Sequence, residues 1–217
     1  MLTIVIPTLN AGESLAACLT ALDGNDVLIV DGGSTDDSVE IAHQAGAHIV
    51  TAPRGRGSQL RAGGEAARSN WLLFLHADTR LGAGWRDAVA KHIAAAPGRA
   101  GFFDLRLDDT AWQARIVERG VALRVGLLGL PYGDQGLLIS RRLYDDVGGF
   151  RPLALMEDVD LVRRIGRSRL RRLDATALTS ADRWRRDGWL RRSARNLACL
   201  ALYAVGVAPD QLARFYR

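Results

Sequence analysis

The first third of the chain alternates short apolar runs with segments of helical periodicity, and this alternation restricts the fold more than any other feature. The apolar runs predict strands, and the segments between them predict helices. Strands are expected at 3–7, 27–30, 48–52 and 71–75, with helices at 14–22, 38–45 and 59–67. Strand, helix and strand in succession produce a mostly parallel sheet with right-handed crossovers. We therefore expect an α/β fold.

The rest of the chain is less regular and continues the same domain. Helices are expected at 85–95, 112–128 and 159–165, and strands at 101–107 and 136–140. From Arg183 onward we expect helix, turn and helix, with Pro209 opening the last segment. Ser34, with Asp37 three residues on, predicts a capping box at the start of the 38–45 helix. No repeat or linker divides the chain, so we expect one domain over 1–217.

Composition restricts the partners only loosely. The chain has 29 Lys and Arg residues against 24 Asp and Glu residues, a net charge of +5, and Lys91 is its only lysine. Arginine suits planar recognition of phosphate, so phosphorylated ligands, nucleic acid and anionic lipid are all compatible with this charge, as is a merely solvated face. No nucleic-acid-binding motif accompanies the charge, and we expect no nucleic-acid partner.

Cysteine usage and the N-terminal residues favour a cytoplasmic location. Cys18 and Cys199 lie far apart in apolar surroundings, which predicts neither a disulfide nor a metal site. Residues 1–7 are apolar and lack a basic segment or cleavage site, so they are expected to form a strand rather than a signal peptide. The longest apolar run, 197–208, is shorter than the roughly 20 residues that span a bilayer.

Polar residues follow the first two strands at the edge where α/β sheets bind ligands. Pro7, Thr8 and Asn10 follow the first strand, and Asp31 and Gly33 the second. A carboxylate beside a tight glycine can hold a ribose while the backbone approaches closely. The same residues also suit a plain turn with helix capping. The chain has no G-x-G-x-x-G and no G-x-x-x-x-G-K, so dinucleotide and P-loop sites lack their phosphate cradles.

Two further motifs contain groups that can do chemistry. His76 and Asp78 follow the fourth strand, where residues i and i+2 point to the same side and can converge on one cation; a helix cap or turn is the alternative. Glu157, Asp158 and Asp160 stand where the 159–165 helix begins. Acids are electrostatically favourable at a helix N-terminus, and one of them could instead act as a general base.

These motifs occur in a fixed order, reading TIVIPTLN at 3–10, VDGGSTD at 30–36, FLHADT at 74–79 and EDVDL at 157–161. The set resembles that of family 2 glycosyltransferases, the inverting enzymes of the GT-A fold. The resemblance implies a single Rossmann-like GT-A domain with a mostly parallel sheet. It further implies a nucleotide-sugar-binding half at 1–107, an acceptor-binding half at 108–180 and C-terminal helices at 181–217.

A second likeness is to a short bacterial subgroup of that family. It is carried by PRGRG at 53–57, LHADT at 75–79 and PYGDQG at 131–136. Some members of this subgroup are named arsenosugar biosynthesis glycosyltransferases. The resemblance leaves the acceptor as a small molecule, a lipid-linked molecule or a glycan.

The family resemblance also implies a role for each motif residue. Asp158 would deprotonate the acceptor hydroxyl, and Glu157 would orient it. Asp134 and Gln135 would shape the acceptor pocket, and Arg56 is a further candidate to contact the donor phosphates or the acceptor. The residues that would bind the nucleoside-diphosphate sugar are Pro7, Thr8, Asn10, Asp31, Gly33, Arg54, Arg61 and Asp78.

Three departures from the family pattern change these expectations. Asp78 and His76 would hold a divalent cation, and because an imidazole replaces the usual carboxylate, either Mn²⁺ in place of Mg²⁺ or only a weak dependence on metal is expected. Gly32 stands where a second acid is usual, which predicts looser recognition of the base. Ser180 replaces the glutamine of the Q-x-x-R-W motif of processive members, which predicts a single-transfer enzyme.

Two other functions stay open on the same fold: a catalytically inactive nucleotide-sugar-binding protein and a nucleotidyltransferase. The C-terminal segment has its own alternatives, because arginines from Arg183 to Arg195 precede the apolar stretch 197–207. Such a segment can lie as an interfacial helix at the inner face of the membrane. It can also pack on its own domain or on a partner subunit in a homodimer.

Overall fold

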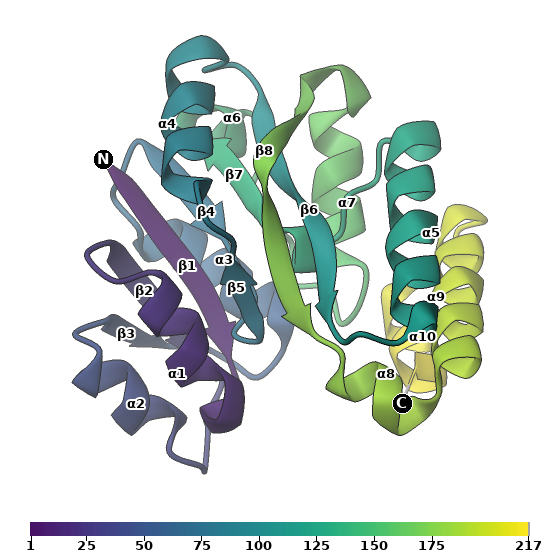
Figure 1. Cartoon of the computed structure of the whole chain (residues 1–217). Helices are drawn as coiled ribbons and strands as arrows, with labels where there is room; N and C mark the ends of the chain where they lie inside the picture. The colour runs from purple at the N-terminus through teal and green to yellow at the C-terminus, as the bar shows by residue number, and fades with distance from the viewer. Residues whose placement is uncertain (217) are drawn as a thin grey trace.

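The structure, a computed structural model, describes residues 1–216 and consists of one eight-stranded sheet with helices on both faces (Figure 1). The strands are β1 (Leu2–Thr8), β2 (Asp26–Asp31), β3 (His48–Thr51), β4 (Trp71–Phe74), β5 (Thr79–Leu81), β6 (Ala100–Asp108), β7 (Leu137–Ser140) and β8 (Leu170–Ser180). The helices are α1 (Gly12–Ala21), α2 (Ser38–Gln44), α3 (Arg56–Ala66), α4 (Trp85–Ala95), α5 (Trp112–Leu128), α6 (Arg141–Asp146), α7 (Glu157–Ile165), α8 (Asp182–Asp187), α9 (Trp189–Ala204) and α10 (Pro209–Tyr216). Short 3₁₀ turns lie at Gly133–Gln135 (η1) and Arg167–Arg169 (η2).

The sheet is mixed and mostly parallel. Its strand order is β3-β2-β1-β4-β7-β6-β8-β5. The first four strands in this order run parallel, as do β6 and β8, whereas β7 runs antiparallel to both of its neighbours and β5 is antiparallel to β8. The expectation of a single α/β domain with a mostly parallel sheet is confirmed.

The core lies on both faces of this sheet, because successive side chains of a strand point to opposite sides. On β1, Ile4 and Ile6 belong to one buried cluster, which α1 and α4 cover. Val5 belongs to a second cluster on the other face, which is covered by α3, α6 and α7. The alternation thereby explains why a strand apolar at every position is buried on both sides.

Strands β5 and β8, helix α6 and the expected capping box differ from the sequence-based expectations. Strand β8 was not predicted, because Arg171 and Arg172 near its start are exposed and conceal the period-two burial that follows. The predicted capping box at Ser34 is wrong. The Ser34 hydroxyl donates to Asp31 Oδ1 at 2.6 Å, and α2 begins after Asp37 without a side-chain cap.

The C-terminal helices pack on the domain itself. Cys199 and Leu200 of α9 and Leu212 of α10 are buried against α7 and its preceding loop, including Met156 and Val159. The segment forms three helices, α8, α9 and α10, where helix, turn and helix were expected. Within residues 1–216, no helix combines the length and the apolar character needed to cross a membrane.

Candidate active site

A pocket lies beyond the carboxyl end of β4, where the N-termini of α3 and α7 meet the C-terminal helices. We call it the main pocket. It is lined by Arg56, His76, Asp78, Tyr132, Asp134, Leu155, Met156, Asp158, Thr179, Ser180, Arg183, Trp184, Arg192, Asn196 and Tyr216. Side chains far apart in the sequence, from α3 to α10, therefore share one cavity.

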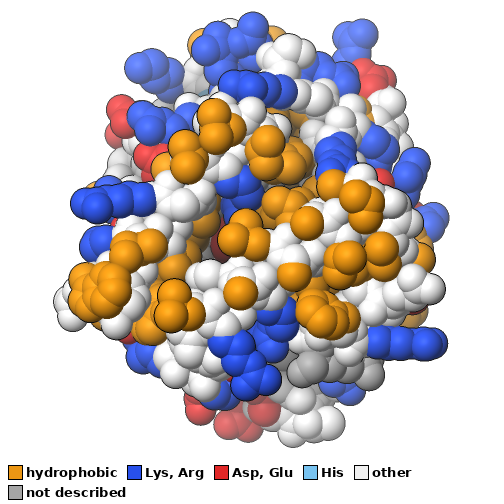
Figure 2. Space-filling view, turned by 90° about the vertical axis from the view of Figure 1, so that its right-hand side faces the viewer, with side chains coloured by type: hydrophobic (Ala, Val, Ile, Leu, Met, Phe, Trp, Pro, Cys, Tyr) orange, Lys and Arg blue, Asp and Glu red, His pale blue; other side chains and the backbone are white. Residues whose placement is uncertain are grey.

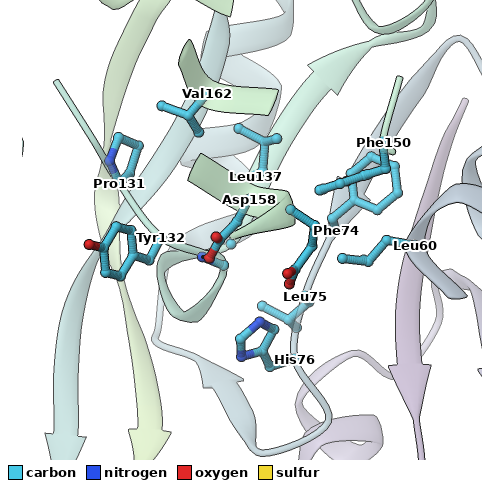
Figure 3. Close-up of a pocket in the computed structure, with 13 residues that line it drawn as sticks. Leu60, Phe74, Leu75, His76, Pro131, Tyr132, Leu137, Phe150, Asp158 and Val162 are labelled. Atoms are coloured by element: carbon cyan, nitrogen blue, oxygen red, sulfur yellow. Dashed lines mark hydrogen bonds between the residues drawn. The ribbon is translucent and has the colours of Figure 1, made fainter. Parts of the chain in front are cut away.

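An inner, mostly apolar pocket adjoins the main pocket. Its lining includes Leu60, Phe74, Leu137 and Phe150, and it shares His76, Tyr132 and Asp158 with the main pocket. Figure 3 shows the His76 ring and the Asp158 carboxylate facing the same space, close to the Tyr132 ring. One side of Asp158 is thus apolar and sheltered from water, while the other faces the polar main pocket.

Asp158 is oriented by hydrogen bonds at the start of α7. Its Oδ2 accepts the Gly133 N–H at 2.8 Å, and its Oδ1 accepts the Val159 N–H at 2.7 Å. The preceding Met156 has φ +65°, a left-handed conformation that is costly for a residue other than glycine. This sharp entry into the helix turns the Glu157–Asp158 pair toward the pocket.

Arg56 links three of these groups. Its Nε donates to Glu157, its Nη2 lies 3.8 Å from Asp158 Oδ2, and its Nη1 lies 3.4 Å from His76 Nε2. Burial works to lower the pKa of Arg56, yet Glu157 and Asp158 raise it, so the guanidinium stays charged. Burial raises the pKa of Glu157, and Arg56 opposes that rise. Arg56 and Glu157 therefore each favour the charged form of the other, and the Glu157 carboxylate is almost fully buried.

His76 and Asp78 stand beside this pair at the end of β4. Burial, with Arg56 and Arg183 nearby, holds the pKa of His76 well below its usual range, so its imidazole is neutral. His76 Nδ1 lies 3.9 Å from Asp78 Oδ1. A neutral imidazole and a carboxylate are both metal ligands. Within residues 1–216, no three His, Cys, Asp or Glu side chains lie together as a preformed metal cluster.

Asp134 faces the same pocket, whereas Gln135 does not. Within residues 1–216, Asp134 Oδ1 is buried without a hydrogen-bond partner, and burial raises the pKa of Asp134 to about 6. Gln135 is buried, and its Nε2 donates to the Phe103 carbonyl at 3.0 Å. Of the two residues expected to shape the acceptor pocket, only Asp134 lines the cavity. The Gln135 side chain lies on the other side of the η1 turn, against β6, and holds the turn in place.

Glycine is required in this turn for space. A Cβ on Gly133 would lie 2.5 Å from His76 Nε2 and 3.5 Å from Asp158 Oδ2. The close approach lets the Gly133 N–H reach Asp158, and it explains the first glycine of the PYGDQG motif. The hydrogen bond from Gly133 to Asp158 could not be predicted from the sequence, because no known motif has this spacing between the two residues.

The residues expected to bind the nucleotide lie together at the ends of β1 and β2, outside the two pockets. Asp31 accepts the Gly33 N–H at 2.9 Å, and Asn10 Oδ1 accepts the Thr35 N–H at 2.8 Å. Pro7 and Thr8 end β1 beside them, and Thr8 is buried. Because β1, β2 and β4 are parallel, this group lies on the same edge of the sheet as His76 and Asp78.

Sequence reasoning missed Gln59, which joins these strand ends. Its buried side-chain amide donates to the Thr8 carbonyl at 2.7 Å and to the Val30 carbonyl at 2.8 Å. It also packs under Gly32, where a Cβ would come within 3.0 Å of the Gln59 side chain. This contact supplies a physical reason for glycine at 32, where the family pattern has an acid.

The three arginines at and near α3 differ in their distance from the two pockets. Arg56 lines the main pocket, whereas Arg61 pairs with Glu65 at 2.8 Å on the exposed side of α3 and lines neither pocket. Arg54 is exposed in the loop before the helix. The structure therefore brings Arg56 together with the acid pair, and it does not bring Arg54 or Arg61 there.

Gly57 sets the distance between α3 and the loop before α7. A Cβ at this position would lie 2.5 Å from the Leu153 carbonyl oxygen and 2.8 Å from the Arg151 carbonyl oxygen. Backbone atoms cannot rotate away, so we expect Gly57→Ala to destabilise the fold by about 1–3 kcal/mol and to separate Arg56 from Glu157. Urea unfolding and a donor-binding assay would measure both effects.

Gly120→Ala is the matched control for that substitution. Gly120 lies in the exposed interior of α5, and no atom lies within 4 Å of the Cβ position. We expect it to stabilise the fold by about 0.5–1 kcal/mol, because alanine favours helix. If both variants unfold like the native protein, the close approach at Gly57 is not structurally important.

Solved structures of low sequence identity share this fold. Staphylococcus aureus TarS 1–349, solved with UDP-GlcNAc, aligns with a TM-score of 0.66 at 15% identity, over 82% of this chain and 58% of that one. Glucosyl-3-phosphoglycerate synthase of Mycobacterium tuberculosis, solved with Mn²⁺, UDP and glucosyl-3-phosphoglycerate, aligns with a TM-score of 0.57 at 18% identity, over 83% and 70%. The fold is that of the GT-A glycosyltransferases.

The chain belongs to glycosyl transferase family 2, whose family model matches residues 3–112. An uncharacterized glycosyltransferase of Mycobacterium tuberculosis is 43% identical over 84 residues, which are 38% of this chain and 38% of that protein. A PGL/p-HBAD biosynthesis glycosyltransferase of the same species is 34% identical over 93 residues, or 37% and 36% of the two chains. Each match thus spans less than two fifths of the relative's length.

Proposed function

We propose that the protein transfers a sugar from a nucleoside-diphosphate sugar to an acceptor hydroxyl and inverts the anomeric configuration. One observation carries the proposal: Asp158 accepts the Gly133 N–H in the wall of a pocket that is also lined by His76, Asp78 and Arg56. A carboxylate for proton removal and a cationic group for a leaving phosphate then face one cavity. Binding alone would need no such carboxylate, which disfavours an inactive nucleotide-sugar-binding protein.

In this mechanism the acceptor oxygen attacks the anomeric carbon as the bond to the diphosphate oxygen breaks. Asp158 takes the hydroxyl proton, and such base catalysis typically supplies about 10²–10⁴-fold in rate. Arg56 and Arg183, which line the same pocket, are placed to stabilise the negative charge of the departing diphosphate. Holding both substrates in one cavity supplies the remaining acceleration through positioning.

The donor nucleotide is proposed to lie across the ends of β1 and β2, against Pro7, Thr8, Asn10, Asp31 and Gly33. Both structural neighbours were solved with a uridine nucleotide, so a uridine-diphosphate sugar is the first donor to test. Arg54 and Arg61 keep a proposed role only at the outer edge of the donor site, since neither lines the pockets.

A divalent cation is proposed at Asp78 and His76. The donor set fits: a carboxylate and a neutral imidazole lie together, and the unpartnered Oδ1 of Asp134 lines the same pocket. When bound, the cation would neutralise charge on the diphosphate. An imidazole among the ligands favours Mn²⁺ over Mg²⁺.

Thermal unfolding with a panel of UDP-, GDP- and TDP-sugars, each with and without Mn²⁺, tests the donor site. A ligand at 100 times its dissociation constant stabilises the fold by about 2.7 kcal/mol, which is visible as a raised Tm. We expect one nucleotide class to raise the Tm of the native protein, and we expect Asp78→Ala to lose most of that rise. Asp174→Ala, an exposed acid on β8, is the control that should keep it.

A flat panel would contradict the donor site. A rise with nucleoside triphosphates and release of pyrophosphate would establish the nucleotidyltransferase alternative. An equal rise in Asp78→Ala would remove Asp78 from the donor and metal site.

Finer features stay part of the proposal. The PRGRG and PYGDQG motifs support membership of the subgroup named for arsenosugar biosynthesis, and Ser180 supports a single transfer. We also propose that residues 1–107 bind the donor and that residues 108–180 bind the acceptor. The contribution of Arg192, Asn196 and Tyr216 to the main pocket suggests that the C-terminal helices contact the acceptor as well.

A further inference from the structure

Exposed apolar side chains run along the whole outer face of α5. Trp112, Ile116, Leu123 and Leu127 are 68%, 53%, 62% and 64% exposed. Their spacing of four, seven and four residues places them on one face of a helix. The opposite face, with Ala114 and Val121, packs into the domain, so this stripe is not needed to hold α5 in place.

Helix α9 carries a second stripe of the same kind. Leu190 and Leu197 are 88% and 65% exposed, and Val205, just beyond the helix, is 80% exposed. Helices α5 and α9 lie side by side (Figure 1). In residues 1–216, every large hydrophobic side chain that is exposed, apart from Met1, lies on α5, on α10 or in the segment from α9 to Val205. We call the outer sides of α5 and α9 the apolar face.

The exposed charged residues on α5 and α9 themselves are all basic, and the acids nearby lie beyond the ends of these helices, as Asp109 and Asp187 do. Residues 188–209 contain no acid, and the only acid of residues 110–133 is Glu118, which is buried under Arg106 and Arg115. Arg119 and Arg191 are exposed on the two helices. Figure 2 shows hydrophobic side chains gathered on this side of the molecule, with basic side chains around them and acidic ones toward its edges.

The apolar stripes and the basic charges together indicate which kind of partner binds the apolar face. A second copy of the chain meeting the same face would bring arginines against arginines, which is unfavourable for a symmetric dimer. An anionic lipid surface complements both features, because apolar side chains enter the acyl boundary while arginines meet the headgroups. Charge complementarity therefore favours lipid over a second copy.

The apolar face is continuous with the wall of the main pocket. Arg192 and Asn196 of α9 line that pocket, and Tyr216 of α10 joins them through hydrogen bonds to both side chains. One helix thus presents an apolar stripe outward and pocket-lining polar groups inward. A surface that holds α9 would also hold the pocket close to it.

We propose that the apolar face of α5 and α9 docks on membranes rich in anionic phospholipid. Docking places the main pocket beside the headgroups, where a lipid-linked acceptor presents its hydroxyl. The surface involves none of the residues assigned to donor binding, so its test is independent of the proposed transfer reaction.

Vesicle co-sedimentation of the full chain tests the proposal. We expect sedimentation with phosphatidylcholine vesicles containing phosphatidylglycerol, little with phosphatidylcholine alone, and weaker binding as salt increases. Leu190→Ser with Leu197→Ser should lower the partition coefficient by roughly tenfold or more, because two exposed leucines lose their contact with lipid. The variants should keep the Tm of the native protein, since the substituted side chains are exposed.

A charge-matched pair separates specific docking from general attraction. Arg119→Ala with Arg191→Ala and Arg68→Ala with Arg142→Ala each lower the net charge by two, and all four arginines are exposed. Only the first pair should weaken binding. No sedimentation at low salt, equal loss in both pairs, or a dimer in analytical ultracentrifugation that the Leu190→Ser and Leu197→Ser variant abolishes would each overturn the proposal.

Discussion

Replacing Asp158 with asparagine should reduce turnover by about 10²–10⁴-fold while leaving donor affinity unchanged. The amide has nearly the same shape as the carboxylate, and its oxygen can still accept the Gly133 N–H, so the η1 turn keeps its position. The amide nitrogen then replaces Oδ1, so the hydrogen bond from the Val159 N–H is lost together with the capacity to take the acceptor proton. Steady-state transfer assays, with donor binding followed by thermal shift, would measure the two quantities separately.

Asp134→Asn is the informative comparison for that variant. Asp134 lines the same pocket, and its carboxyl, with a pKa raised to about 6 by burial, is still mostly ionised at pH 7. We expect its substitution to change acceptor KM more than kcat. If Asp158→Asn turns over at nearly the native rate while Asp134→Asn does not, Asp134 is the base and our assignment is wrong.

Replacing Arg56 with alanine should have the largest effect on stability among the site residues. It leaves the Glu157 carboxylate, only 2% exposed, without its partner. We expect a loss of about 3 kcal/mol, the lower end of the range for a broken buried pair, because the Arg56 side chain is 37% exposed and water replaces part of the contact. Urea unfolding at pH 8 gives this difference directly.

The loss should shrink as the pH falls. Burial already raises the pKa of Glu157 in the folded protein, and without Arg56, which opposes that rise, it increases further. A carboxyl whose folded-state pKa lies above its unfolded value stabilises the fold when protonated, and that contribution disappears as the pH rises through the folded pKa. Repeating the unfolding at pH 5 should therefore bring the variant closer to the native protein.

Arg61→Ala is the matched control on the same helix. Arg61 and Glu65 form an exposed pair with side chains 54% and 63% accessible, so the expected loss is below about 1 kcal/mol at either pH. A loss in Arg61→Ala as large as in Arg56→Ala would show that the effect comes from α3 as a whole and not from the buried charge pair.

The sequence predicted the regular elements well where burial alone fixes them. Helices α4 and α5 have their expected bounds; β1 and β2 extend one residue further at both ends, and β3 and β4 end one residue earlier than expected. Strand β8 was missed because its exposed arginines interrupt the apolar pattern, and the short β5 and α6 carry too few buried residues to stand out. Tertiary contacts with β6 determine β8, and these are not visible in a local pattern.

For the site, the motifs could be located from the sequence, but which side chain of each motif faces the pocket could not. Arg56 and Arg61 are five residues apart, which is about 140° around a helix, so only one can face the pocket. Both residues are arginines, so their chemistry does not show which one faces the pocket. Helix α3 begins at Arg56, and this starting point places Arg56 toward the pocket and Arg61 away from it. The same holds for Asp134 and Gln135, which are adjacent and point to opposite sides of the η1 turn.

The position of β7 in the sheet has a consequence during synthesis. Strand β4, buried at all four residues, pairs with β1 on one side and with β7 on the other. The β7 residues emerge more than sixty residues after β4, an interval of several seconds at roughly 5–20 residues per second. Throughout that interval the nascent sheet carries an open, wholly apolar edge. Translation speed between residues 75 and 140 thus sets how long a neighbouring nascent chain can pair there in place of β7.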